Sequence, residues 1–376
     1  MKIKRGYLKA FNREKRVLQM FGVYPVKSSQ IKYSLLRFII CFAVNSIQLY
    51  LMMMLLVTKD ISNFLEAWHF IIITIIVLFK ISFLVLASTD MKDVEDYLNN
   101  FDTVDIPHGI VDYVIGEAYF RNRLYLPQWT TVVSAVTFQL SACLIFHNLG
   151  LVLFISWSPF NLQHPTYYYL TLIFQVVVFF SNGMPNVTID TMYYILVDVA
   201  CCEIDVLMYK LSNLDPLKNP NETLKDLKEY VVCHQKILRY ITLIQRNVYS
   251  KLMFLQCIGS IMVICALGFQ FTMTVNWFLF IQHATYFSSM IFQIFGYTWF
   301  GQKFMGKSQE ITQACYMSRW YECDIRIQKM LLIIMTRTKK PLVLSSYIFD
   351  LTLETFLGVL KSSYSYMALL RTMYNK

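Results

Sequence analysis

The sequence predicts an all-α, polytopic membrane protein with seven transmembrane helices, a cytoplasmic amino terminus and an extracellular carboxyl terminus. Of its 376 residues, 56% are hydrophobic and only 15% are charged, and the mean hydropathy of +0.45 lies above the usual range of soluble domains. The long apolar runs lack the alternation of apolar and polar residues that a membrane β-barrel needs, so the spans are expected to be helices. Lys and Arg gather in every second loop, which predicts the direction of the crossings.

The first two spans are expected at about residues 33–57 and 64–87. A helix needs about 20 apolar residues to cross the hydrocarbon layer, and residues 38–58 carry no formal charge. The second span contains Lys80, whose ammonium group we expect to point into the helix bundle or to extend toward the inner surface. The segment from Met1 to Arg37 holds ten Lys or Arg residues and no apolar core, so we expect no cleavable signal peptide.

A long charge-free run predicts the third and fourth spans. Residues 124–189 are 66 consecutive positions without Asp, Glu, Lys or Arg, which is enough for two crossings. We expect these spans at about 127–156 and 166–190, joined by a short uncharged outer loop.

A second charge-free run predicts the fifth and sixth spans. Residues 252–302 are 51 such positions, which predicts a tight hairpin of two spans at about 250–275 and 277–302. The seventh span is expected at about 342–372, directly after Pro341, which should end the helix before it.

Some spans are expected to continue into the cytosol as anchor helices, at about 190–250 and 303–340. The helical pattern over residues 166–213 covers about 48 positions, or roughly 70 Å, more than twice the hydrocarbon thickness, with a kink expected at Pro185. Residues 309–338 have the pattern of one amphipathic helix. We infer an intracellular helical bundle, which either packs within one chain or anchors subunits against each other.

The distribution of basic residues predicts the orientation. The segment before the first span has ten Lys or Arg, and the loops on the same side have three, eight and eight, whereas the loops on the other side have one, none and none. Positively charged loops stay in the cytosol, so seven crossings put the carboxyl terminus outside, opposite to a G-protein-coupled receptor. This orientation and anionic lipid explain the basic amino-terminal segment without a nucleic-acid partner.

The sequence lacks the common motifs for nucleotide binding, zinc binding and hydrolysis. The sequence has no nucleotide-binding loop, no zinc-ligand spacing and no hydrolase motif, so we expect no cofactor, no metal and no catalytic residue. An intramembrane enzyme using His147 or His283 remains an alternative, which is disfavoured because neither has a carboxylate within its charge-free run to orient it.

The carboxyl-terminal third carries a series of residues in a recognisable order. They are Gly301 and Gly306 before Ser308, the segment Ala314–Trp320, Lys339-Lys340-Pro341, the Thr355-Phe356 pair, and Lys361-Ser-Ser-Tyr-Ser-Tyr. This series resembles the insect odorant receptor family, and Gly22-Val-Tyr-Pro25 resembles that family's short motif near the start.

The resemblance implies a function and partners. The chain looks like a ligand-tuning subunit, because the family's shared co-receptor has a long insertion in its second intracellular loop, where this chain is short. Such a subunit would form a heterotetramer with the co-receptor in the plasma membrane of a sensory neuron. A small apolar volatile would then open a central, non-selective cation pore lined by the last helix. The alternative is a gustatory-type ligand-gated channel, which needs no co-receptor but whose terminal signature differs from this one.

The last helix has a polar stripe that suits such a pore. Successive side chains of an α-helix are 100° apart around its axis. From Glu354 to Thr372, side chains spaced by four or three residues therefore point within about 40° of the direction of Glu354. The alternative is that Ser362, Ser363 and Ser365 bond carbonyls one turn back inside a packed helix. Lys361 would repel a permeant cation, so we expect it to turn aside or toward Glu354. The predicted pore-lining and gate residues are Glu354, Gly358, Lys361, Ser365, Ala368, Leu369 and Thr372, with Ala368 and Leu369 forming an apolar gate.

A ligand pocket is expected among the outer halves of spans two, three, four and six, where the resemblance places it. These segments are rich in aromatic and aliphatic residues with few hydrogen-bonding groups, which suits a small apolar volatile. Taken singly, each candidate is also explained as core packing. The candidates are Ile73, Thr74 and Val77; His147, Gly150 and Phe154; Phe174 and Val178; and Ile281, Ala284, Tyr286 and Phe287.

Overall fold

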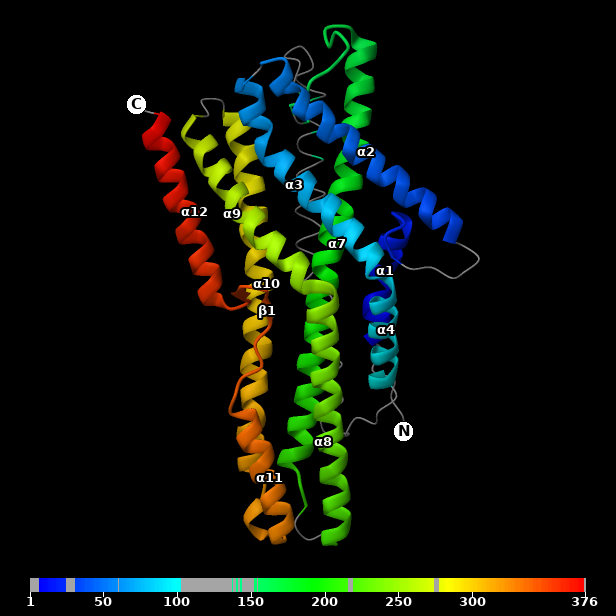
Figure 1. The fold of residues 1–376 in the computed structure, drawn as a ribbon, viewed down its shortest axis with the longest axis vertical. Coiled ribbons are helices and arrows are strands. Elements are labelled where there is room, and N and C mark those ends of the chain that lie inside the picture. Colours follow the sequence, from blue (N-terminus) through cyan, green and yellow to red (C-terminus); the bar gives the residue numbers. More distant parts are fainter. Residues whose placement is uncertain are drawn as a thin grey trace.

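The computed structural model describes residues 7–24, 31–59, 61–102, 137, 140, 143, 152–153, 155–215, 219–273 and 277–374. Within these residues the chain is almost entirely helical (Figure 1). The helices are α1 (Tyr7–Met20), α2 (Ile31–Val57), α3 (Ile61–Leu86), α4 (Ser88–Asp102), α7 (Pro165–Ser212), α8 (Pro220–Leu243), α9 (Ser250–Met273), α10 (Trp277–Met317), α11 (Ile325–Thr338) and α12 (Leu353–Tyr374).

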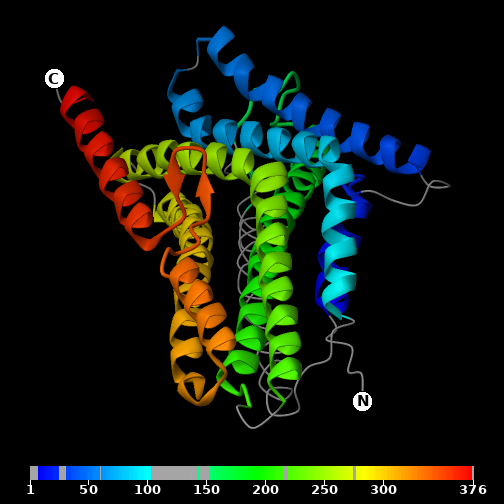
Figure 2. The ribbon, with the colours of Figure 1, turned by 60° about the horizontal axis from the view of Figure 1, so that its bottom comes forward.

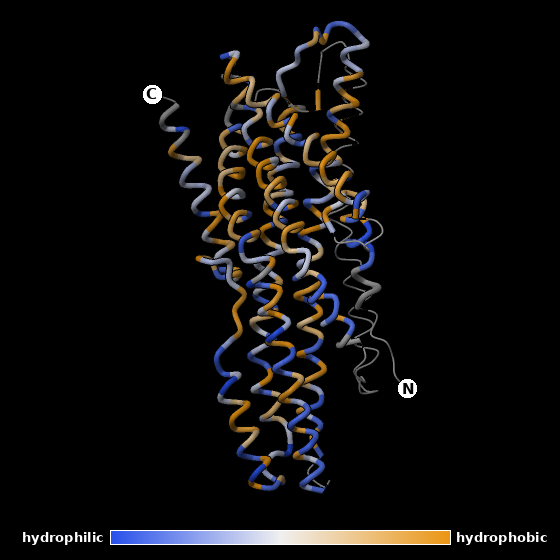
Figure 3. The backbone as a smooth tube through the Cα atoms, turned by 45° about the vertical axis from the view of Figure 1, so that its right-hand side comes forward, coloured by the Kyte–Doolittle hydropathy of each residue, from blue (hydrophilic) through white to orange (hydrophobic). Residues whose placement is uncertain are grey.

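The molecule has an apolar end and a more polar end. Figure 3 shows hydrophobic residues concentrated in the upper half, whereas the lower half alternates between hydrophilic and hydrophobic positions. Three helices of the described part are long and apolar enough to cross a membrane by length and composition: residues 31–57, 66–86 and 250–271. The predicted third span, 127–156, lies largely outside the described residues.

Helix α7 forms the centre of the molecule. It begins at Pro165, where the missing N–H of proline is harmless in the first helical turn, and it continues without interruption past Pro185 to Ser212. Almost every residue from Val187 to Ile204 is buried, which is the pattern of a helix surrounded by others on all sides. Its neighbour α10 also runs through both halves of the molecule, so these two helices join the apolar end to the polar end (Figure 1).

A π-helical segment, η3 (Ile244–Tyr249), joins α8 to α9. Figure 2 shows that α8 and α9 meet there at a steep angle. A π-helical turn adds a residue to the helical repeat and is a common cause of a sharp bend. The bend lets α8 run along α7 in the polar half while α9 crosses the apolar half.

The predicted seventh helix begins later than expected. Residues 342–352 are not helical; they contain a small antiparallel hairpin of β1 (Ser345–Ser346) and β2 (Phe349–Asp350), and α12 starts at Leu353. Tyr347 at the hairpin tip has a φ of 47°, a left-handed conformation that cannot continue an α-helix. The predicted helical start at 342 is therefore wrong.

Tertiary contacts hold this hairpin in place. The Nε2 atom of Gln245, in η3, donates to the carbonyl of Ser345 at 2.7 Å. On the other side α10 approaches so closely at Gly301 that a Cβ atom there would lie 2.1 Å from the carbonyl oxygen of Leu351. A glycine is required at this position because any side chain would displace the hairpin.

The predicted single helix over 309–338 is also wrong. Helix α10 ends at Met317, a short 3₁₀ turn, η4 (Trp320–Glu322), follows, and α11 begins at Ile325. The carboxylate of Asp324 caps α11 by accepting from the backbone N–H of Arg326 at 2.8 Å, which favours a new helix start. The chain then turns back, and the hydroxyls of Thr312 and Thr338 meet at 2.7 Å.

Gly22 ends α1 with a φ of 72°, a conformation that favours glycine. The two residues after it are buried, and the hydroxyl of Tyr24 donates to Glu95 of α4 at 2.8 Å. The short Gly-Val-Tyr motif thus fastens α1 against α4.

Candidate ligand cavity and uncovered face of α12

A cavity of about 100 Å³ lies in the apolar half, between α2, α3, α7 and α10. Its lining residues are Gln48 and Met52 of α2; Phe70, Ile73 and Thr74 of α3; Val178, Phe179, Asn182, Gly183, Asn186 and Val187 of α7; and Tyr286, Ser289, Met290 and Gln293 of α10.

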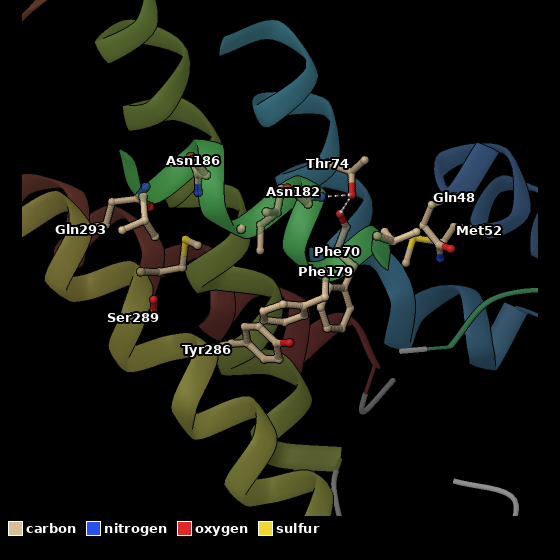
Figure 4. A pocket seen from close by; sticks show the side chains of 15 residues that line it. Gln48, Met52, Phe70, Thr74, Phe179, Asn182, Asn186, Tyr286, Ser289 and Gln293 are labelled. Carbon is tan, nitrogen blue, oxygen red and sulfur yellow. Dashed lines mark hydrogen bonds between the residues drawn. The ribbon is translucent and has the colours of Figure 1, made fainter. Parts of the chain in front are cut away.

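Aromatic rings form one wall of the cavity. The rings of Phe70 and Tyr286 meet nearly edge to face, with centroids 4.9 Å apart, so α3 contacts α10 here. Phe179 of α7 lies beside them (Figure 4). Such a wall offers a ligand apolar surface, which contributes about 25 cal/mol for each Å² that is buried.

A chain of hydrogen bonds forms another wall. The hydroxyl of Thr74 donates to the carbonyl of Phe70 at 2.8 Å and accepts from the Nδ2 atom of Asn182 at 3.1 Å (Figure 4). Helix α3 is therefore joined to α7 by polar contacts at the edge of the cavity.

A buried charged network lies next to the cavity. The Nζ atom of Lys80 is 2.7 Å from Oδ1 of Asp190 and donates to Oδ1 of Asn186 at 2.8 Å, and both charged side chains are completely buried. The side-chain amide of Gln293 and the hydroxyl of Tyr297 also donate to the Asp190 carboxylate. Lys80 thus points into the bundle, one of the two directions expected from the sequence.

The network supplies hydrogen-bond partners to two polar residues of the cavity wall. Asn186 accepts from Lys80, and Gln293 donates to Asp190 while its Oε1 atom accepts from Gln256 at 2.9 Å. These contacts join α3, α7, α9 and α10 in one polar cluster, which compensates the desolvation of the two charges.

Four of the predicted pocket residues line the cavity. They are Ile73, Thr74, Val178 and Tyr286.

The other described candidates lie elsewhere in the packing. Val77 is fully buried in the core, and Phe174 packs with the cluster around Leu172. The ring of Phe287 contacts that of Phe271, with centroids 5.5 Å apart, and Ile281 and Ala284 do not line the cavity. The candidates His147, Gly150 and Phe154 lie outside the described residues.

Sequence reasoning missed the contribution of α2. Gln48 and Met52 come from the first span, which was not expected to reach the pocket. Gln48 is a polar residue within a charge-free apolar span, and such residues rarely face lipid. The lining is also more polar than expected, because Asn182, Asn186 and Gln293 come from α7 and α10.

None of the described residues covers one face of α12. Helix α12 lies at the edge of the molecule, beside α9 and α10 (Figure 1). The exposed residues on it include Glu354, Gly358, Lys361, Ser365, Leu369 and Thr372, and Ala368 is half-buried.

The opposite face of α12 packs against the chain. Val359 and Ser363 are buried. Met367 packs against Gly268 of α9, where a Cβ atom added to the glycine would lie 2.7 Å from the sulfur atom of Met367. The helix therefore has one packed face and one open face, and the predicted pore residues lie on the open face.

The hydroxyls of α12 bond to their own helix. Ser363 donates to the carbonyl of Val359 at 2.9 Å and Ser365 to that of Lys361 at 3.0 Å. Both serines thus make the hydrogen bonds to carbonyls one turn back that were considered as the alternative to a pore-lining role. Ser363 is buried, however, whereas Ser365 is exposed. Among the described residues, no ion pair joins Lys361 to Glu354, and both side chains are exposed.

The sequence matches a known family and several known proteins. The family model described as 7tm Odorant receptor matches residues 60–364. Odorant receptor 10 of Aedes albopictus is 28% identical over 219 residues, which are 57% of this chain and 57% of that protein. Odorant receptor 85b of Drosophila melanogaster is 25% identical over 224 residues, which are 59% of this chain and 57% of that protein. The matched part spans less than two thirds of these relatives' own length.

The fold is similar to that of solved structures. The insect olfactory receptor OR5 from Machilis hrabei in complex with eugenol superposes with a TM-score of 0.85 over 98% of this chain and 100% of that one, at 16% identity. A second structure of OR5 superposes with a TM-score of 0.82 over 97% and 99%, again at 16% identity. The likeness shows the fold, and with the family match it confirms the predicted all-α membrane protein with seven transmembrane helices.

Proposed function

Since this chain belongs to the 7tm odorant receptor family, we propose that it is the ligand-tuning subunit of an odorant-gated, non-selective cation channel. It would form a heterotetramer with the shared odorant co-receptor in the plasma membrane of a sensory neuron, with its amino terminus in the cytosol and its carboxyl terminus outside. The members of this family are receptors, so the expectation that the chain is not an enzyme is confirmed.

The observation that carries this proposal is the open face of α12. In a helix that faced only lipid, charged groups such as Glu354 and Lys361 would be unfavourable. Four such helices facing one another around an axis would enclose a water path with small and polar walls. Ala368 and Leu369 would form an apolar constriction, which closes by excluding water.

The ligand of this channel would occupy the cavity between α2, α3, α7 and α10. The similar OR5 protein from Machilis hrabei is solved with eugenol, a small volatile molecule. A cavity of about 100 Å³ with an aromatic wall suits a molecule of this kind, although a smaller one.

One apolar cluster connects the cavity to α12. Met290 lines the cavity and belongs to the same cluster of buried residues as Val359 of α12. The ring of Phe356, also on α12, contacts that of Phe295 on α10 with centroids 5.6 Å apart. A ligand that displaces Met290 would change the packing beneath α12, and we propose this contact as the route from binding to opening.

Current recordings test the proposal. Cells expressing this chain with the co-receptor are exposed to a panel of volatiles while G-protein signalling is blocked. We expect ligand-evoked cation current that survives the block and requires the co-receptor. Loss of the current under the block would support a G-protein-coupled receptor instead, and current from this chain alone would support a gustatory-type channel.

A further inference from the structure

The hairpin before α12 is held by the π-helical segment η3. The Nε2 atom of Gln245 donates to the carbonyl oxygen of Ser345 at 2.7 Å and to its hydroxyl at 3.1 Å. Where η3 passes into α9, the hydroxyl of Ser250 accepts from the backbone N–H of Tyr347 at 3.3 Å. Helix α12 begins shortly after the hairpin, at Leu353, and β1 lies beside its lower end (Figure 1). These contacts therefore fix where α12 starts.

The π turn lets two tyrosines contact α7 at once. The hydroxyl of Tyr240 in α8 donates to the carbonyl of Leu196 at 3.1 Å, and that of Tyr249 in η3 donates to the carbonyl of Ile189 at 3.5 Å. In an unbroken α-helix, these two positions would point about 180° apart. The extra residue of the π turn reduces this angle to about 80°, so both side chains can reach the same neighbouring helix. Packing against α7 thus favours the π turn, and with it the position of Gln245.

The same π turn contacts the charged network beside the cavity. The ring centroid of Tyr249 lies 5.0 Å from that of Tyr193, which lies 5.4 Å from that of Tyr297. The hydroxyl of Tyr297 donates to Asp190, and Asp190 also accepts from Gln293 of the cavity wall. All three tyrosines are buried, and a close-packed interior transmits a displacement from one ring to the next.

One turn of helix therefore connects the cavity wall with the start of α12. Tyr249 contacts the network, and Gln245, in the same turn, contacts the hairpin. We propose that Gln245 is a positioning residue for α12: it ties the hairpin to η3, so that a shift of the network beside the occupied cavity moves the first turn of α12. This inference rests on the proposed function, and it adds a polar route at the start of α12 to the apolar route through Met290.

A glutamine elsewhere in the chain makes the same kind of bond without this connection. Gln328 of α11 is half-buried like Gln245, and its Nε2 atom donates to the carbonyl of Cys323 at 2.9 Å. Neither Gln328 nor Cys323 belongs to η3, the hairpin or α12. Replacing either glutamine by leucine removes a hydrogen bond to a backbone carbonyl, but only Gln245 joins the π turn to the hairpin. Gln328→Leu is therefore the matched control.

Current recordings give the first test. The wild type, Gln245→Leu and Gln328→Leu are expressed with the co-receptor, eugenol, benzaldehyde and hexanol are applied, and the current is divided by the number of receptors labelled at the cell surface. We expect Gln245→Leu to lower the maximal current per surface receptor at least about threefold, because the cavity no longer moves α12 effectively. The concentration for half-maximal current should change less than the maximal current, since the cavity lining is intact. Gln328→Leu should match the wild type in both quantities.

Hydrogen exchange tests the connection without any ligand. The exchange rate of the backbone amides of residues 344–352 is measured in the purified full-length chain. Gln293→Met removes one donor to Asp190 at the cavity, and we expect it to raise the exchange rate of the hairpin at least about threefold, as Gln245→Leu should also do. In the double variant the two effects should not add, because one path carries both. Tyr297→Phe keeps the ring and removes only the bond to Asp190, so it takes the place of Gln293→Met if that variant does not fold.

The two measurements separate this inference from the channel proposal. A wild-type receptor that conducts with no volatile overturns the channel proposal, while non-additive exchange still supports the positioning role of Gln245. Additive exchange in the double variant overturns the inference, because Gln245 is then only a local support of the hairpin. Where the wild type conducts, a current per surface receptor in Gln245→Leu equal to that in Gln328→Leu overturns it as well.

Discussion

The Nζ atom of Lys80 lies 2.7 Å from the Oδ1 atom of Asp190, and neither side chain has any exposed surface. This pair joins α3 to α7 next to the candidate ligand cavity. Two charges lose their hydration here, and their mutual attraction and the added bonds from Asn186, Gln293 and Tyr297 compensate for that loss. The arrangement makes the stability of the apolar half depend on both partners together.

The Lys80→Met variant should be strongly destabilised, because it leaves the Asp190 carboxylate buried without a counter-charge. We expect the free energy of unfolding to fall by about 3–5 kcal/mol, measured as a lower apparent Tm of the purified protein and less receptor at the cell surface. The double variant Lys80→Met with Asp190→Asn removes both charges and keeps an acceptor for Tyr297, so it should recover most of the loss. A single variant as stable as the wild type would contradict the role assigned to the pair.

The two faces of α12 should differ in access to water. In the proposed channel, the Ser365→Cys variant places a thiol on the open face, so a charged thiol reagent applied from outside should modify it and reduce the ligand-evoked current. Ser363 is 2% exposed on the packed face, and its Cys variant is the matched control, which should stay unmodified. Equal labelling at both positions would show that the open face of α12 does not line the water path.

Two glycines of α10 provide a matched test of the hairpin contact. At Gly301 a Cβ atom would lie 2.1 Å from the Leu351 carbonyl oxygen, whereas at Gly306 nothing lies within 4 Å. Gly301→Ala should lower stability by about 1–3 kcal/mol, as overpacking does, and should also disturb the start of α12 and hence the current. Gly306→Ala should raise stability by up to about 1 kcal/mol, because alanine favours a helix. Thermal unfolding of both variants measures the difference, and a reversed order would contradict the close approach of α10 to the hairpin.

Glu14 of α1 should make stability depend on pH. Burial raises the pKa of its carboxyl above the ordinary value of 4.5, although Arg13 beside it acts in the opposite direction. The folded chain therefore holds the proton more tightly than the unfolded chain, so this contribution to stability is present at acidic pH and is lost as the pH rises through the folded pKa. Glu14→Gln cannot ionise, so its thermal stability relative to the wild type should be higher near pH ~7 than near pH ~4. If Glu14→Gln changed the thermal stability by the same amount at both pH values, burial of the Glu14 charge would be excluded as the cause of the change.

The spacing of residues along α12 was enough to assign its two faces. Side chains 100° apart return to the same face every third or fourth position, and the exposed Glu354 and Ser365 and the buried Val359 and Ser363 follow that period. The start of the helix could not be found in the same way. The hairpin before it depends on contacts with Gln245 and Gly301, which lie about 100 and 50 residues away in the chain.

The cavity was only partly predictable for a similar reason. Thr74 and Tyr286 could be chosen because they lie in the apolar halves of spans that the resemblance brings together. Gln48 could not be assigned to the same site, because its place depends on how α2 crosses α7 near Asn45 and Ser181. A polar residue in an apolar span shows that a partner exists, but not which partner it is.

The sequence alone determined the class of the protein, because a backbone in lipid must satisfy its own hydrogen bonds and long uncharged runs can do so only as helices. The series of motif residues in its carboxyl-terminal third also indicated the family that the comparisons then showed. Only the tertiary structure decided that Lys80 meets Asp190, that Gln48 is among the residues lining the cavity and that α12 keeps one face open. These relations join residues from different helices, and the crossing of helices is set by side-chain packing over the whole molecule rather than by any local pattern.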